Sequence, residues 1–151
     1  MENLCGKCSI CCSTHRIDKA EIYWKDEDKA PGEVCEKLID GQCSAYKDRP
    51  TTCKKYECLW RQLVKTKNEY SVAFRPDNLG VVVDTYYHEK SSKFVFAIKE
   101  IKPGKFNLHD LDPALDILLK GILELSNKQK GTCVVIAYQY GKNTGATITL
   151  K

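Results

Sequence analysis

The second half of the chain alternates apolar and polar positions in the way that is typical of β-strands. Five segments rich in β-branched and aromatic residues are predicted to be strands, at 70–74, 79–87, 94–101, 132–140 and 146–150. Residues that tolerate tight turns separate these segments. Between the third and fourth segments, Asp112 is predicted to cap a helix that begins at Pro113 and ends before Gly131.

The order of these elements predicts the fold class. The two strands directly before the helix, the helix itself and the two strands after it indicate a two-layer α+β arrangement, in which one main helix covers one face of a mainly antiparallel sheet. The first 65 residues differ, because they contain few apolar segments long enough to build a core unaided. We therefore expect a cysteine-rich, metal-stapled module at 1–65 and a sheet-plus-helix region at 66–151, packed together as one unit.

Two short helices are expected in the first part of the chain. Asp18 and Glu21 form a capping box that predicts a helix reaching Trp24. The second helix is predicted to begin at Pro50 and to continue through Val64, with an apolar face that docks on the second half.

Cysteine spacing is the strongest chemical signal in the sequence. Eight of the nine cysteines lie between residues 5 and 58, and four of them form the run Cys5-Gly6-Lys7-Cys8-Ser9-Ile10-Cys11-Cys12. A gap of two residues allows two sulfurs to turn toward one ion. Eight thiolates suffice for two four-coordinate ions, or for one cluster with thiols to spare. The predicted metal ligands are Cys5, Cys8, Cys11, Cys12, Cys35, Cys43, Cys53 and Cys58.

The spacing leaves the identity of the metal open. One or two zinc ions are the first expectation, and iron or an iron-sulfur cluster is the alternative, because thiolates suit both metals. The triplet Cys5, Cys8 and Cys11 has the spacing by which a loop holds three irons of a cluster. Adjacent side chains diverge in extended backbone, so Cys11 and Cys12 are expected to serve different centres. Cys133 lies in an apolar run and is expected in the core.

The second group of cysteines lies in a longer pattern, in which Gly41-Gln42-Cys43, Tyr46 and Arg49-Pro50-x2-Cys53 follow Cys35. Together with the N-terminal run, this pattern resembles the YkgJ-like family, whose members carry a CxxCxxCC motif and are described as zinc or iron chelators. The match covers about residues 5 to 58. The resemblance implies that the eight cysteines are the ligands. The spacing between Cys53 and Cys58 is wider than in many relatives.

Three further side chains lie near the cysteines in the sequence. Arg49 either donates hydrogen bonds to thiolate sulfur or pairs with a surface acid such as Asp48. Tyr46 is expected to be a packing residue with a polar tip. His15 is an alternative ligand that would replace one thiolate.

Composition and charge narrow the possible functions. The formal net charge is +4. Eight thiolates and two zinc ions change it by −8 + 4 = −4, so the loaded protein is near neutral and a nucleic-acid partner is not expected. No apolar run approaches the roughly 20 residues of a membrane span. The start lacks a secretory signal, which favours the reducing cytoplasm.

No constellation typical of an enzyme is visible apart from the predicted metal centre. The sequence lacks paired catalytic carboxylates, a nucleophile elbow and a phosphate-cradling glycine loop. The expected function is therefore metal chelation with an undetermined binding or regulatory role, and the partner is a small molecule or a protein. An iron-sulfur or non-haem iron redox protein is the alternative.

Overall fold

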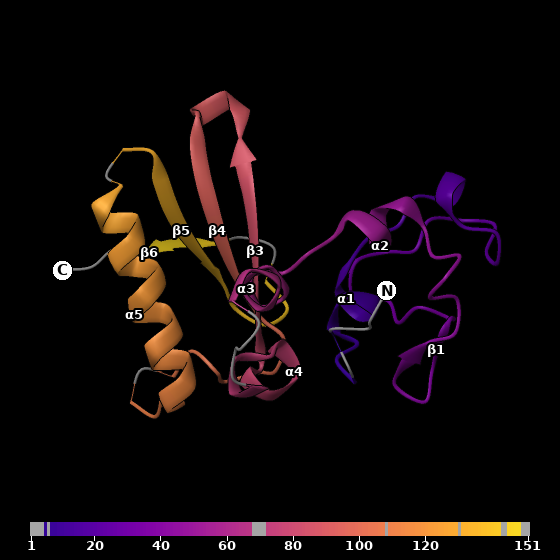
Figure 1. Ribbon diagram of the computed structural model, residues 1–151, viewed down its shortest axis with the longest axis horizontal. Helices are drawn as coiled ribbons and strands as arrows, with labels where there is room; N and C mark the ends of the chain where they lie inside the picture. Colours follow the sequence, from indigo (N-terminus) through magenta and orange to yellow (C-terminus); the bar gives the residue numbers. More distant parts are fainter. Residues whose placement is uncertain are drawn as a thin grey trace. The chain divides into compact units, whose positions relative to one another are not determined.

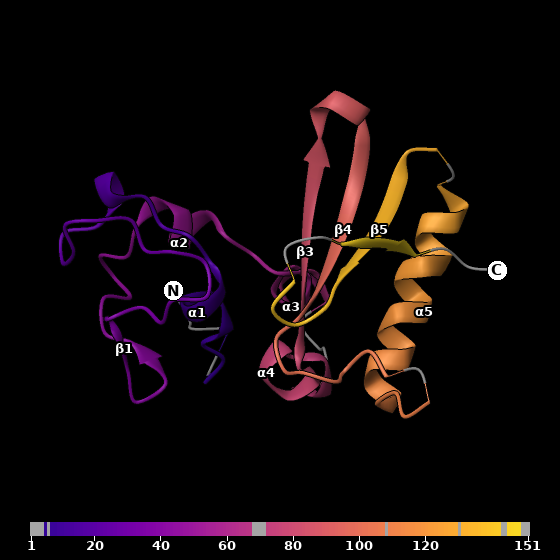
Figure 2. The same cartoon turned by 180° about the vertical axis from the view of Figure 1, so that it is seen from behind.

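The computed structural model describes residues 5, 7–67, 72–107, 109–129, 131–142 and 145–148. It divides the chain into two compact units, Met1–Glu57 and Cys58–Lys151 (Figures 1 and 2). The chain contains helices and two separate β-sheets, so it has the predicted mixed α+β character.

The first unit is built from very short elements. In chain order they are α1 (Ile10–Thr14), the 3-10 turn η1 (Lys19–Glu21), β1 (Leu38–Ile39), β2 (Gln42–Cys43) and α2 (Thr51–Lys55). Strands β1 and β2 form an antiparallel hairpin. Its two turn residues, Asp40 and Gly41, have φ angles of 50° and 74°, which an Asp-Gly pair adopts readily.

Hydrogen bonds over long sequence separations hold the first unit together. An antiparallel bridge joins Ile17 and Lys29. The carboxylate of Glu21 accepts two hydrogen bonds from Thr52, one from the backbone N–H (2.7 Å) and one from the hydroxyl (2.8 Å). Residues 13–34 connect the two groups of cysteines. The bridge joins two parts of this connector, and the Glu21 bonds join the connector to the first turn of α2.

The helix predicted after Asp18 is shorter than expected. The side chain of Asp18 accepts a hydrogen bond from the N–H of Ala20 (2.9 Å), so the predicted cap is confirmed. The helix is a single 3-10 turn, because the backbone becomes extended at Ile22, and it does not reach Trp24.

The second unit contains the larger sheet and the long helix. Its elements are α3 (Leu59–Lys67), η2 (Val72–Phe74), α4 (Pro76–Leu79), β3 (Val81–His88), η3 (Glu89–Ser91), β4 (Lys93–Glu100), α5 (Pro113–Lys128), β5 (Cys133–Tyr138) and β6 (Ala146–Ile148). The strand order is β3-β4-β5-β6. The outer pairs are antiparallel, whereas β4 and β5 are parallel.

The sheet is mainly antiparallel, as predicted, with one parallel pair, β4 and β5, at its centre. Two parallel neighbours require a crossover connection, and α5 lies within the connection between β4 and β5. Figure 1 shows α5 beside the sheet. As predicted, Asp112 caps this helix, and its carboxylate accepts hydrogen bonds from the N–H groups of Ala114 and Leu115.

The core of the second unit lies between α5 and the sheet. Alternate residues of β3 and of β4 point to one face, as the strand period requires, and they pack with one residue of β5 against two residues of the helix. The buried cluster consists of Leu79, Val81, Val83, Phe96, Ile98, Leu115, Ile122 and Val135. The strands predicted at 79–87, 94–101 and 132–140 are all confirmed, with shifted ends; for 146–150, β6 covers Ala146–Ile148 and the rest lies outside the described residues.

Two other predictions differ from the structure. The helix predicted from Pro50 to Val64 is interrupted at 56–58, because Tyr56 takes an extended backbone conformation, and it becomes α2 and α3. The strand predicted at 70–74 is wrong where the chain is described, since Val72–Phe74 is a 3-10 turn; residues 70 and 71 lie outside the described residues. The side chain of Asn78 holds this turn by donating to the carbonyl oxygen of Val72 (2.7 Å).

Candidate metal centre

Five of the eight predicted ligands come from separate elements of the first unit. Cys11 and Cys12 lie on α1, Cys35 precedes β1, Cys43 lies on β2, and Cys53 is the central residue of α2. The backbone N–H of Cys35 donates to the carbonyl oxygen of Cys12 (3.0 Å), which joins the two halves of the cysteine pattern directly.

Cys11 and Cys12 are a coupled pair. The Cys11 thiol donates a hydrogen bond to the Cys12 sulfur, which raises the pKa of Cys11 strongly, and burial raises it further. Accepting the same bond lowers the pKa of Cys12. The expectation that these sulfurs diverge assumed extended backbone and is wrong, because α1 is helical at this point. Both sulfurs are therefore available to one centre.

The remaining three sulfurs lie within electrostatic range of this pair. Burial raises the pKa of Cys53 to about 11, and the nearby Cys11, Cys35 and Cys43 raise it in the same direction. The hydrogen bond from Cys11 lowers the pKa of Cys12, whereas burial and the charges of Cys43, Cys35 and Cys53 act in the opposite direction and raise it. We call Cys11, Cys12, Cys35, Cys43 and Cys53 the thiol cluster.

The other three predicted ligands flank the thiol cluster in sequence. The N–H of Cys8 donates to the carbonyl oxygen of Cys5 (2.9 Å), which forms a turn directly before α1. Cys58 is the first residue of the second unit and precedes α3. Its carbonyl oxygen accepts a hydrogen bond from the N–H of Gln62 (3.1 Å).

Lys29 is a functional candidate that the sequence analysis missed. Its side chain is 2% exposed, and Nζ donates to the carbonyl oxygens of His15 (2.6 Å) and Ala30 (3.4 Å). Burial lowers the pKa of Lys29, whereas the charges of Cys35, Glu33, Cys12 and Cys53 raise it. The residue follows a run of charged side chains and precedes Ala30-Pro31-Gly32, a context typical of surface lysines, so its sequence position carries no signal of burial.

Arg49 and Tyr46 bring a second positive charge to the same region. The guanidinium carbon of Arg49 lies 4.0 Å from the centre of the Tyr46 ring, a cation–π contact. The charge of Arg49 acts to lower the pKa of Cys53. Among the described residues, Arg49 Nε and the Tyr46 hydroxyl are buried and have no hydrogen-bond partner. A buried donor without a partner costs free energy, so a hydrogen-bond acceptor or an anionic group at this position would be stabilised.

His15 and Cys133 occupy other surroundings. The His15 ring lies 3.8 Å from the Tyr56 ring, and its Nδ1 is 2.9 Å from the Thr14 hydroxyl, contacts that favour packing over ligation. Cys133 begins β5 and packs against the core of the second unit, as expected.

The donor set of the thiol cluster suits a soft metal ion. Thiolate sulfur binds zinc, copper(I) and iron in clusters, and nearby positive side chains such as Lys29 and Arg49 offset the negative charge of several thiolates. Within the described part of the chain, no three cysteine, histidine or acidic side chains are arranged as a group that could hold an ion. Metal binding would therefore require deprotonation of the thiols and a closer approach of the sulfurs.

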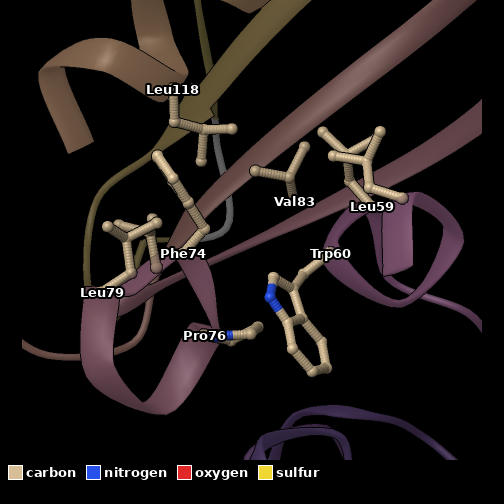
Figure 3. A pocket seen from close by; sticks show the side chains of 9 residues that line it. Leu59, Trp60, Phe74, Pro76, Leu79, Val83 and Leu118 are labelled. Atoms are coloured by element: carbon tan, nitrogen blue, oxygen red, sulfur yellow. The ribbon is translucent and has the colours of Figure 1, made fainter. Parts of the chain in front are cut away.

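The second unit contains a small apolar pocket (Figure 3). Side chains from α3, η2, α4, β3 and α5 line it, and Nε1 of Trp60, one of the lining residues, is buried without a hydrogen-bond partner in the described chain. The cavity volume of about 10 Å³ is no larger than the space that one water molecule needs. This pocket is therefore too small to hold a small-molecule partner.

No protein-family model, curated protein or solved structure matches this chain. The resemblance to the YkgJ-like family thus stays a prediction, and the function is argued from the residues themselves. No helix in the described residues is long and apolar enough to cross a membrane.

Proposed function

We propose that the first unit is a thiolate metal-binding module that holds one or two zinc ions through the predicted cysteines. The thiol cluster carries this proposal, because five sulfurs from four separate segments lie within electrostatic range of one another. Without a ligand, such a concentration of thiols brings no packing advantage over ordinary apolar side chains.

The small core of the first unit supports the same proposal. In the described part of this unit, the buried apolar side chains, apart from Pro50, are those of Ile17, Ile22, Cys35 and Ala45. Its strands have two residues and its helices three to five. A chain segment of this size does not stabilise itself through so few buried groups, and small domains commonly use a structural metal instead. Metal binding would then supply folding free energy.

The chemistry of the donors favours a closed structural site over a catalytic one. Zinc takes four ligands in tetrahedral geometry, and four thiolates leave no position for water or substrate. The module would thus present a fixed surface to a partner, and its thiols would persist in a reducing compartment such as the cytoplasm.

An iron-sulfur cluster is the second candidate. The turn formed by Cys5 and Cys8 leads directly into α1, where Cys11 lies, so these three thiols follow one another along a single loop and helix. This order is the one by which a loop binds three irons of a cluster. Visible absorption from sulfur-to-iron charge transfer distinguishes this candidate from colourless zinc.

The test is elemental analysis of protein purified anaerobically without added metal. We expect one or two zinc ions per chain, and we expect Cys12→Ser and Cys35→Ser to lose at least one ion each. Cys133→Ser is the matched control and should keep the full metal content, since this cysteine packs in the other unit. Wild-type protein with neither zinc nor iron would refute the proposal.

A further inference from the structure

We propose that the buried Lys29 and the half-buried Arg49 are the counter-charges of one four-thiolate metal centre formed within the thiol cluster, and that they set its affinity for a divalent ion. This inference rests on the proposed function and adds the number of ions, the charge of the centre and two residues that act on it. Both residues belong to the first unit, as do the five cysteines of the thiol cluster.

The surroundings of Lys29 lack the usual partner of a buried ammonium group. Its Nζ contacts two carbonyl oxygens, and within the described chain it forms no ion pair with a carboxylate. The nearby acid Glu33 is engaged by Lys25 at 2.6 Å. Burying a charge without an opposite charge is costly, and the side chain is only 2% exposed. The sulfurs of the thiol cluster are the remaining source of negative charge.

Arg49, on another segment, also has a donor group without an anionic partner among the described residues. Its guanidinium packs on the Tyr46 ring, and its buried Nε has no hydrogen-bond partner among the described residues. Guanidinium N–H groups donate well to anionic acceptors, and thiolate sulfur on Cys53 is close enough to respond to its charge. Binding of metal would provide this acceptor, because coordination keeps the sulfur deprotonated.

The charges of these groups balance for one ion. Four thiolates and one divalent ion have a net charge of −4 + 2 = −2, and Lys29 and Arg49 together contribute +2. Two ions with eight thiolates would leave −4, which Lys29 and Arg49 only half neutralise. The centre expected in the thiol cluster is therefore a single ion with four of the five sulfurs as ligands.

The probe is Co²⁺, titrated into reduced protein in competition with a chromophoric chelator. We expect one ion in the thiol cluster, with the absorption of tetrahedral sulfur-bound cobalt. Lys29→Met and Arg49→Met should each weaken binding about tenfold, within the range known for residues that support metal ligands. Lys54→Met is the matched control, because it removes one positive charge beside Cys53 from an exposed position, and it should leave the affinity unchanged.

A further variant separates charge from tethering. Lys29→Gln retains a donor for the His15 carbonyl but loses the charge, so it should weaken binding as much as Lys29→Met. The absorption at saturating cobalt shows whether each variant forms the same centre, and Arg49→Met tests the proposal from a second segment if Lys29→Met does not fold. Affinities of Lys29→Gln and Arg49→Met equal to that of Lys54→Met would overturn the inference. Wild-type protein that binds no metal would instead refute the proposed function.

Discussion

The two units of this chain use different sources of stability. The second unit has strands of eight residues, a helix of 16 residues and a cluster of eight buried apolar side chains, among which Leu115 and Ile98 are 0% exposed. The first unit has no element longer than five residues within its described part, and it buries a lysine. One unit is organised by apolar burial, and the other brings five cysteine thiols within electrostatic range of one another.

The two units are therefore expected to differ in how far their stability depends on a bound ligand. A core of interdigitated apolar side chains is stable without a ligand, since burial of apolar surface stabilises it directly. Under the proposed function, the first unit depends on its metal ion, and we expect its folding to respond to metal concentration and redox state. Comparing the two units within one molecule therefore provides an internal control for every experiment on the metal.

Removal of the metal should have the largest effect. A strong chelator is expected to abolish amide protection throughout the first unit, including the N–H groups of Lys29, Cys35 and Ser44, which bond to distant carbonyl oxygens. Amides of β3, β4 and α5 should keep their protection, because their core includes none of the predicted metal ligands. Hydrogen exchange followed by mass spectrometry measures both units in one sample.

Restoring zinc provides the control for this experiment. Protection of the first unit should return on addition of zinc in the presence of a thiol reductant, and it should not return with Mg²⁺, which prefers oxygen ligands. If the first unit retains its protection while stoichiometric metal has been removed, its stability does not come from the ion and the comparison fails.

The sequence predicted the two units to different depths for a physical reason. Apolar periodicity identified β3, β4, β5 and α5, because each of these elements buries one face against the same core. In the first unit the predictive signal was the spacing of cysteines. It identified the residues of the thiol cluster but not their geometry, and it placed Cys11 and Cys12 in extended backbone where the chain is helical.

Other features could not be predicted because they depend on tertiary contacts. Burial of Lys29 arises from its bridge to Ile17, a partner 12 residues away that local sequence does not specify. The interruption after α2 coincides with the packing of Tyr56 against His15. The parallel pairing of β4 with β5 follows from the path of α5 across the sheet, which alternation alone does not determine.

A core substitution should affect only the second unit. Leu115→Ala is expected to destabilise it by about 2–5 kcal/mol, because the side chain is fully buried and its removal leaves a cavity. Ile117→Ala, two residues along the same helix but 61% exposed, is the matched control and should change stability by less than about 0.5 kcal/mol. Denaturant unfolding followed by the near-ultraviolet signal of Trp60 measures both, and zinc affinity should remain that of the wild type in each variant.

The smallest expected effect tests a contact that holds the first unit around the thiol cluster. Two hydrogen bonds from Thr52 lower the pKa of Glu21 below its ordinary value of 4.5. Because the folded pKa is the lower one, the carboxylate stabilises the folded unit above pH 4.5, and this contribution disappears as the pH falls through the folded pKa. Glu21→Gln should therefore be less stable than wild type near neutral pH, and the difference should shrink at more acidic pH.

Fluorescence of Trp24 in a Trp60→Phe background reports unfolding of this unit, and Asp26→Asn, at an exposed position of the same connector, provides the control. A stability difference that stays constant from neutral pH to about pH 4 would mean that Glu21 contributes through packing and not through its charge.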